Sequence, residues 1–248
     1  VSLANRCGQL VGALVCGLLL EYHGAASAFS ALAIMHLCGA AAFFRLQERA
    51  QPKQASGESL RANIAEYLHE MRHNPTLWRL TAIASAVEIF GFSFATALPE
   101  LATTHLQLGA DGLGFIHGAR SVGGLLAGLI LAQRGRLHRT GYAYIGVIVG
   151  FGVALIALSV VPSLLIAMLV AALIAMAAAS CDVLVQSMLQ LSVADHLRGR
   201  AMGAWVLALG AGPIGHLQVG FLGGVIGASA TLAVNGGVMI ALGALTFF

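Results

Sequence analysis

Charged side chains are scarce in this sequence. Asp, Glu, Lys and Arg make up only 9% of the 248 residues, whereas an ordinary soluble domain contains about 25%. Hydrophobic residues make up 58% of the chain. A soluble domain of this composition would have too few polar side chains to cover its surface. The composition therefore excludes an ordinary globular protein and predicts a polytopic membrane protein with the lipid bilayer as its surroundings.

The sequence also gives little sign of nucleotide, metal or disulfide chemistry. It contains no GxxxxGK[ST] phosphate loop. Its four cysteines stand singly in apolar runs without CxxC spacing, which favours small core residues over metal ligands or disulfide partners; they are Cys7, Cys16, Cys38 and Cys181. The net charge of +3 does not indicate nucleic-acid binding, because the arginines follow membrane topology. We expect no metal, no cofactor, no nucleic-acid partner and no enzymatic activity.

Long apolar runs dominate the chain. A helix that crosses a bilayer needs about 20 apolar residues. Eight runs meet this requirement, at roughly 4–20, 25–44, 77–98, 112–133, 141–161, 163–190, 200–223 and 228–248. Most breaks between them are short, which favours antiparallel neighbouring helices. The predicted fold class is an all-α transmembrane bundle of about eight spans.

A glycine pattern near the start of the chain returns near its end. Gly12, Gly17 and Gly24-Ala25 match Gly215, Gly220 and Gly227-Ala228, with a constant offset of 203 residues. Internal symmetry of this kind is typical of membrane transporters built from repeated bundles. If the first helix pair repeats in the last pair, one unit contains about six helices. We then expect the chain to begin part-way through its first unit.

The long polar segment 45–76 separates two apolar regions. Within it, an apolar stripe recurs at helical spacing, formed by Leu60, Ile64, Tyr67, Leu68 and Met71. This pattern predicts an amphipathic helix at the membrane surface or against the bundle. We expect three parts: residues 1–44 as the last two helices of an N-terminal bundle, 45–76 as a cytoplasmic linker, and 77–248 as a C-terminal six-helix bundle.

The basic residues are distributed asymmetrically. If every span crosses the membrane, twelve of the thirteen Lys and Arg residues lie on one side. By the positive-inside rule that side is cytoplasmic. The exception is Arg120, which lies inside an apolar run. The pattern predicts a multi-pass membrane protein whose basic loops are cytoplasmic.

Three local strings resemble a known family. They are Leu98-Pro99-Glu100, the run Gly114-Phe115-Ile116-His117-Gly118-Ala119-Arg120-Ser121-Val122-Gly123-Gly124-Leu125-Leu126-Ala127-Gly128, and Asp195-His196-Leu197-Arg198-Gly199-Arg200-Ala201-Met202-Gly203. Together with the repeat and the linker, they resemble the major facilitator superfamily, in the drug and siderophore branch that includes the enterobactin exporter. The resemblance implies that the chain covers helices five to twelve of twelve. It also implies a monomeric transporter of the bacterial inner membrane that works by rocker-switch alternating access.

One loop is similar to the cytoplasmic gating motif of that superfamily, G-x-L-A-D-R-x-G-R. Gly128, Gly135 and Arg136 match the motif, but Ala132 stands where the family has its acidic residue. We treat these three residues, with Arg198 and Arg200 of the next basic loop, as gating candidates. The alternative is that the loop is a basic topology anchor.

Glu88 is the clearest candidate for a functional residue. It lies about 16 Å into the span 77–98 at a rise of 1.5 Å per residue, near mid-bilayer. Ionisable groups at a helix centre cost roughly 2.5–3.5 kcal/mol on insertion scales, so their presence points to function. We interpret Glu88 as a proton-coupling residue. The alternative is a carboxyl group that hydrogen-bonds to a neighbouring helix.

Other polar residues lie in the apolar runs. Asp182 forms a polar stripe with Gln186 and Gln190. Asp182 is a second proton-coupling candidate, and the alternative is that it simply lies near water. Gln186 is a substrate-binding candidate. Arg120 has two functional interpretations: it binds an anionic group of the substrate, or it sets the pKa of Glu88. Its structural alternatives are that it snorkels to the membrane surface or pairs with Glu88 or Asp182. His117 and Phe92 are further substrate-binding candidates, with packing roles as their alternative.

The resemblance and these residues predict a secondary active transporter. The expected reaction is proton-coupled export of small amphiphilic compounds, such as drugs or siderophores. Two alternatives remain open at this stage: an uptake or lysolipid-flipping transporter, and a truncated membrane module that does not transport.

Overall fold

A computed structural model describes residues 2–45, 72, 74–134, 139–193 and 198–246, which form helices and turns and no strand. Seven segments in these ranges are long and apolar enough to cross a membrane; they are His23–Ala42, Pro75–His105, Ala110–Gln133, Thr140–Ser159, Leu164–Leu191, Ala201–Ile226 and Ala228–Leu245. The predicted all-helical membrane bundle is confirmed. The predicted span at 4–20 is helical but is not one of the seven, so the total of eight stays a prediction. The predicted helix in the linker lies outside the described residues.

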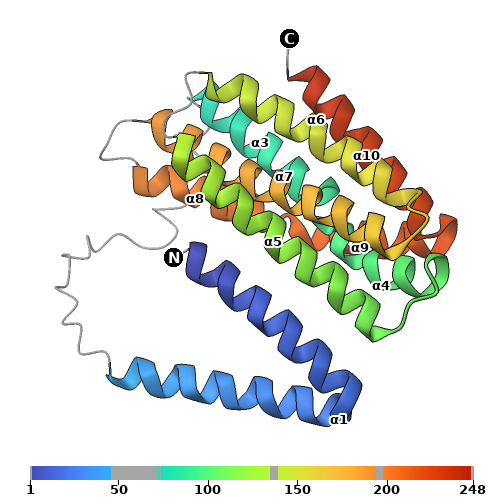
Figure 1. Ribbon diagram of the computed structural model, residues 1–248. Helices are drawn as coiled ribbons and strands as arrows, with labels where there is room; N and C mark the ends of the chain where they lie inside the picture. Colours follow the sequence, from blue (N-terminus) through green and yellow to red (C-terminus); the bar gives the residue numbers. More distant parts are fainter. Residues whose placement is uncertain (1, 46–71, 73, 135–138, 194–197, 247–248) are drawn as a thin grey trace.

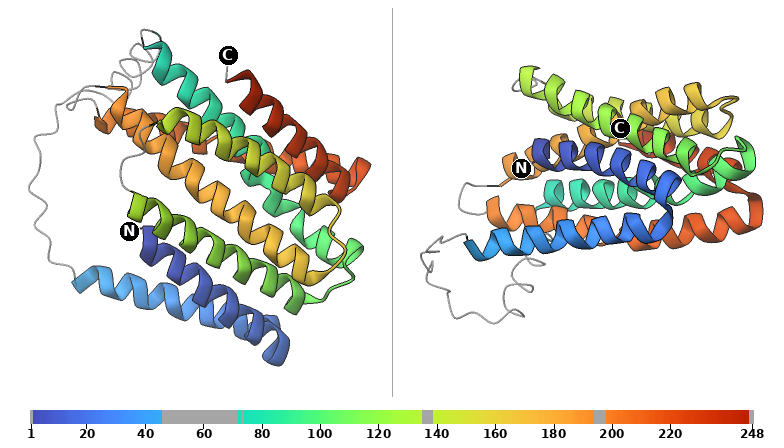
Figure 2. Two further views of the ribbon diagram at one scale, coloured as in Figure 1. Left: turned by 45° about the horizontal axis from the view of Figure 1, so that its top comes forward. Right: turned by 60° about the horizontal axis from the view of Figure 1, so that its bottom comes forward.

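The first element, α1 (Ser2–Arg45), consists of two helical arms that meet at Gly24. Gly24 has φ 76°, in the left-handed region that favours glycine. Gly227, at the matching position of the repeated pattern, has φ 82° and separates α9 (Gly212–Ile226) from α10 (Ala228–Leu245). The two matching glycines therefore have similar backbone conformations. Figures 1 and 2 show α1 lying beside α5 (Ala110–Arg134) at one side of the remaining helices.

The remaining helices form one bundle (Figure 1). Its elements in chain order are α3 (Pro75–Phe90), η1 (Phe92–Thr96), α4 (Leu98–Glu100), η2 (Leu101–His105), α5 (Ala110–Arg134), α6 (Thr140–Ser159), α7 (Leu164–Leu191), α8 (Arg198–Leu209), α9 and α10. Two spans are longer than predicted and are interrupted. The segment 75–105 changes from α-helix to a 3-10 turn at η1 and to a π-helix at η2. The segment 201–226 breaks between α8 and α9.

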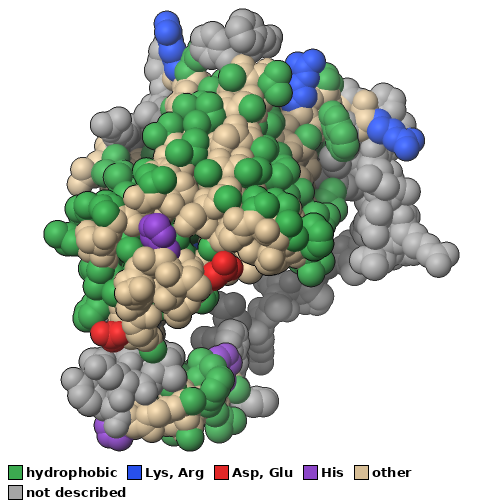
Figure 3. Space-filling model, turned by 90° about the vertical axis from the view of Figure 1, so that its right-hand side faces the viewer, with side chains coloured by type: hydrophobic (Ala, Val, Ile, Leu, Met, Phe, Trp, Pro, Cys, Tyr) green, Lys and Arg blue, Asp and Glu red, His purple; other side chains and the backbone are tan. Residues whose placement is uncertain are grey.

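The outer surface of the bundle is divided by polarity. Figure 3 shows Lys and Arg side chains towards the upper end of the molecule and Asp and Glu side chains lower in the view. Hydrophobic side chains are spread over the surface between them. The exposed large apolar side chains of the bundle include Leu169, Phe221 and Leu217, which is 76% exposed. An apolar band between two polar ends is the surface that a bilayer requires.

Asn74 fixes the start of α3. Its side-chain oxygen accepts a hydrogen bond from the Leu77 backbone N–H at 3.0 Å, and Pro75 occupies the first helical turn. The Asn74 amide also donates to the carbonyl oxygen of Ser192 at 3.2 Å, just after the end of α7. The same residue therefore caps one helix and joins it to another.

Glycines allow the helices of this bundle to approach closely. On α6 and α10, Gly152 and Gly236 face each other, and a β-carbon on Gly236 would lie 2.6 Å from the Gly152 carbonyl oxygen. On α5, a β-carbon on Gly123 would overlap the backbone of Ala172 on α7. Packing through small residues is the usual way in which membrane helices associate.

The α6–α10 contact gives a direct test of this packing. We expect Gly236→Ala to lower the free energy of unfolding by about 1–3 kcal/mol, because overpacking moves backbone and side chains. Gly237→Ala is the matched control, since a β-carbon on Gly237 meets nothing within 4 Å. Thermal unfolding of the purified protein in detergent measures both changes. Equal stability of the two variants would contradict the described contact.

Candidate functional site

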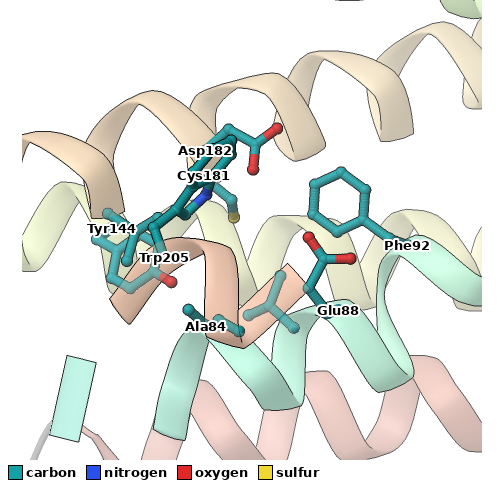
Figure 4. A pocket seen from close by; sticks show the side chains of 10 residues that line it. Ala84, Glu88, Phe92, Tyr144, Cys181, Asp182 and Trp205 are labelled. Atoms are coloured by element: carbon teal, nitrogen blue, oxygen red, sulfur yellow. The ribbon is translucent and has the colours of Figure 1, made fainter. Parts of the chain in front are cut away.

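A small pocket opens between α3, α6, α7 and α8, next to the start of η1 (Figure 4). It holds about 230 Å³ of empty space, part of it open to the surroundings. Ten residues line it: Ala84, Val87, Glu88, Phe92, Tyr144, Cys181, Asp182, Val185, Trp205 and Ala208. Two of the ten carry carboxyl groups, Glu88 and Asp182, here called the acid pair. Figure 4 shows the two carboxyl groups pointing toward each other, with Phe92 beside them.

The sequence of α3 places Glu88 at this pocket. The buried residues of α3 include Ala84 and Val87, so Glu88, four residues after Ala84, lies at the border of the buried face. Glu88 is half-buried. No hydrogen bond joins its carboxyl group to another side chain or backbone group in the part of the chain that the structure describes. Its carboxyl group is therefore open to exchange with a ligand, water or a proton.

The N-terminus of α9 lies close to Glu88. A β-carbon on Gly212, the first residue of α9, would lie 3.8 Å from Glu88 Oε2. The first turn of a helix favours a nearby negative charge because its backbone N–H groups point outward. Glu88 is therefore placed between a second carboxyl group on α7 and the positive end of α9. A change in its charge would be felt by both helices.

Asp182 comes to the pocket from α7. It is half-buried and follows Cys181, which is 2% exposed. It is close enough to Glu88 for the two carboxyl groups to interact electrostatically. Of the predicted polar stripe, Gln186 is half-buried but does not line the pocket, and Gln190 donates to Met202 Sδ on α8 at 3.1 Å. Of the predicted stripe, only Asp182 lines the pocket, while Gln190 joins α7 to α8.

Sequence reasoning missed the two large aromatic residues Tyr144 and Trp205, which line this pocket together with the predicted Phe92. Tyr144 is 2% exposed, and its hydroxyl group has no hydrogen-bond partner among the described residues. Trp205 comes from α8 and closes the pocket opposite Glu88 (Figure 4). The only sequence signal was a polar aromatic residue within each apolar run, a signal that does not say which way the side chain points.

The unpaired Tyr144 hydroxyl leads to a stability prediction. A buried polar group without a partner costs about 1–3 kcal/mol, and Tyr144→Phe removes only the hydroxyl oxygen. We expect this variant to unfold at the same temperature as the wild type or a few degrees higher. Thermal unfolding in detergent decides the matter, because a drop of several degrees would mean that the hydroxyl group has a stabilising partner.

Arg120 lies outside this pocket, on α5. Its Nη1 donates to His117 Nδ1 at 3.0 Å, and its guanidinium carbon lies 4.6 Å from the ring centre of Phe94. Because His117 accepts at Nδ1, its ring is neutral here and carries its proton on Nε2. The Nε of Arg120 is buried without a hydrogen-bond partner. Within the described ranges, no ion pair joins Arg120 to Glu88 or Asp182.

The broken segment η1 connects these two places. Phe92 lines the acid pocket, and Phe94 lies under Arg120. Both rings pack edge-on against Phe151 of α6, with centroid distances of 6.0 and 6.3 Å. Gly91 permits this arrangement, since a β-carbon there would lie 2.9 Å from the Phe151 ring.

The predicted gating residues are only partly described. Gly128 is exposed on α5, and nothing lies within 4 Å of the position of its β-carbon. Gly135 and Arg136 fall outside the described residues. Arg198 and Arg200 begin α8, but their side chains are not described. Their gating role stays a prediction.

Sequence reasoning also passed over the string His69-Glu70-Met71-Arg72-His73, which matches the HExxH pattern of some zinc sites. Of these five residues only Arg72 lies in the described part of the chain. Across the described residues, no group of three His, Cys, Asp or Glu side chains is arranged to hold a metal ion. The string is a match in sequence alone.

A family model with the description Major Facilitator Superfamily matches residues 1–140, more than half of the chain. The chain belongs to the Major Facilitator Superfamily. Members of this superfamily are multi-pass membrane transporters rather than enzymes, which agrees with the seven apolar helices. The predicted superfamily is thus confirmed. The finer assignment, to the branch of the enterobactin exporter and to helices five to twelve, stays a prediction.

One curated relative extends the likeness over nearly the whole chain. It is the "Multidrug efflux pump Tap" of Mycolicibacterium fortuitum, 25% identical over 246 residues, covering 97% of this chain and 60% of the relative. The major facilitator chain described here therefore spans about 60% of the length of that relative. No solved structure matches the present chain.

Proposed function

We propose that this major facilitator chain exports small amphiphilic compounds, drugs or siderophores, in exchange for protons. Membership of the superfamily supports transport, and the relative named a multidrug efflux pump supports export as its direction. The proposal retains the predicted organisation, with residues 1–44 and 77–248 belonging to two bundles joined by the linker 45–76. It also retains a monomer in the bacterial inner membrane.

The observation that carries the proton coupling is the acid pair. Glu88 and Asp182 come from two different membrane spans and face one small pocket. Two neighbouring carboxyl groups share a proton more readily than two distant ones, because both resist being charged together. Intramembrane carboxyl groups are rare and commonly serve as proton relays. We assign Glu88 the role of proton carrier and Asp182 the role of its partner.

The small size of the pocket favours separate sites for the proton and the substrate. Pockets for drug-sized ligands usually measure about 300–1,000 Å³, whereas the enclosed part of this pocket measures about 10 Å³, room for about one water molecule. It suits a proton and a water better than a whole drug molecule. We place the substrate beside it, against Phe92, with Gln186, His117 and Arg120 as further contacts.

The position of Glu88 supports a mechanism of alternating access. When Glu88 gains a proton, its repulsion with Asp182 falls and α3 can move closer to α7. When it loses the proton, the N-terminus of α9 attracts the negative charge. Each change in charge therefore favours a different packing of the same helices, which is the bistable element that alternating access requires.

Transport in inverted membrane vesicles tests this function. Vesicles from cells that express the chain, and from cells without it, receive a pH gradient that is acidic inside, with ethidium as the amphiphilic probe. The proposal predicts ethidium accumulation that depends on the chain and collapses on adding a protonophore. Accumulation that resists the protonophore would contradict proton coupling, ethidium movement out of the vesicles would indicate uptake, and no difference from empty vesicles would contradict transport.

A further inference from the structure

Arg120 is a half-buried positive charge, and no carboxylate pairs with it among the residues that the structure describes. It is the eleventh of the 25 residues of α5, about 15 Å from the start of that span at 1.5 Å per residue. A positive charge at this depth is costly unless it is paired. In the described part of the chain the only polar partner of its guanidinium group is His117, which is neutral when it accepts this bond.

The guanidinium group is held in place within the bundle. Phe94, which lies beneath it, is 1% exposed and packs against Phe151. Stacking on an aromatic ring attracts a guanidinium group through the negative face of the ring. A side chain fixed in this way does not snorkel to the membrane surface, which removes one of the two structural explanations. The other, pairing with Glu88 or Asp182, is not observed among the described residues.

The N–H donors of Arg120 that have no partner indicate which chemical group can bind to it. Arg has five N–H donors in a planar fork, and one of its terminal nitrogens already donates to His117. The Nε donor is buried without a partner. An oxyanion such as a carboxylate, sulfonate or phosphate can accept from two donors of this fork at once and neutralises the charge. A neutral or cationic group does neither.

We infer that Arg120, held by Phe94 and His117, binds the anionic group of those transported amphiphiles that carry one. This inference rests on the proposed transport function and names one class of its substrates, the amphiphilic organic anions. The apolar body of such a molecule fits along η1, where Phe92 faces the acid pocket. The segment η1 then contacts the bound anion at one end and the proton site at the other.

Binding of a matched pair of probes tests the inference. The probes are 2-naphthoate and the uncharged 2-naphthamide, which have nearly the same shape. The protein is the purified chain in nanodiscs of phosphatidylcholine, and the readout is the dissociation constant of each probe. We expect the wild type to bind naphthoate at least tenfold more tightly than naphthamide. Equal affinities would overturn the inference.

Variants of Arg120 locate the site. Arg120→Gln should reduce naphthoate affinity at least tenfold and leave naphthamide affinity unchanged, while Arg139→Gln, at an exposed position before α6, should change neither. If Arg120→Gln does not fold, Arg120→Lys serves instead, because it keeps the charge but loses the planar fork; we expect a severalfold loss. Naphthoate affinity that survives in the folded variant would overturn the inference.

Two further comparisons distinguish a lipid anion from a free anion, and a failure of this inference from a failure of the proposed function. A lipid phosphate group has the same chemistry as a substrate anion, so the binding is repeated in nanodiscs that contain phosphatidylglycerol. If naphthoate binds more weakly in the nanodiscs with phosphatidylglycerol, lipid headgroups compete for the site. If its affinity is unchanged, the site binds the free anion alone. Either result supports an anion site at Arg120. If the wild type exports ethidium but does not prefer naphthoate, this inference alone fails. If it exports nothing, the proposed function fails.

Discussion

Replacing Glu88 by Gln should abolish transport driven by a pH gradient. The amide keeps the shape of the side chain but cannot take up or release a proton, so the pocket between α3 and α7 loses its changeable charge. We expect gradient-driven ethidium accumulation in inverted vesicles to fall at least tenfold, to the level of vesicles without the protein. Downhill movement of ethidium should continue, because the helices can still rearrange without the proton.

The control for this variant is Asp111→Asn. Asp111 is exposed in the first turn of α5, outside the pocket, so its loss removes a carboxyl group without affecting the acid pair. We expect this variant to accumulate ethidium like the wild type. Full gradient-driven accumulation by Glu88→Gln, at equal expression, would remove Glu88 from the coupling mechanism.

The second large effect is expected at Gly215 on α9. A β-carbon at this position would overlap the backbone of Ile89, the residue after Glu88. Because the obstacle is backbone and not a flexible side chain, α9 would have to move away from α3. We expect Gly215→Ala to lower the free energy of unfolding by about 1–3 kcal/mol, the usual cost of overpacking. Gradient-driven transport should fall severalfold, because the start of α9 moves away from Glu88.

Gly220 provides the control on the same helix. It is exposed, and a β-carbon there meets nothing within 4 Å. Gly220→Ala should leave both the thermal midpoint and ethidium accumulation unchanged. If Gly215→Ala is as stable and as active as Gly220→Ala, then α9 does not pack on α3 as described.

The positions of the membrane helices could be predicted because hydrophobic runs and turn residues are local signals. The predicted apolar run 77–98 begins close to the start of α3, and Gly24 and Gly227, the matching glycines of the repeated pattern, lie at the turns of the two helix pairs. The interruption of the third span after Gly91 could not be predicted. The residues from Phe92 to Leu98 contain no proline or charge that would mark a break, and the rings of η1 pack against Phe151 on α6, a distant helix that a local signal does not report.

The candidate site could be predicted in part. Charged residues within apolar runs stand out, and so Glu88, Asp182 and Arg120 were recognised from sequence. The sequence did not say which of them meet. Tertiary packing brings Glu88 to Asp182 and leaves Arg120 with Phe94 and His117.

The aromatic residues of the site were harder to find. Tyr144 and Trp205 line the pocket, but in sequence they resemble any aromatic residue of a membrane helix. Their role depends on which face of α6 and α8 is turned inward. The hydrophobic pattern of a nearly all-apolar helix does not give that orientation.

The most direct test of proton coupling is proton movement driven by the substrate alone. The purified chain is placed in proteoliposomes that contain a fluorescent pH indicator, with equal pH on both sides, and an ethidium gradient is applied. If Glu88 carries the coupled proton, wild-type liposomes should show proton flux opposite to ethidium flux, and Glu88→Gln liposomes should show none. Ethidium flux without proton flux in the wild type, or equal proton flux in Glu88→Gln, would contradict the assignment.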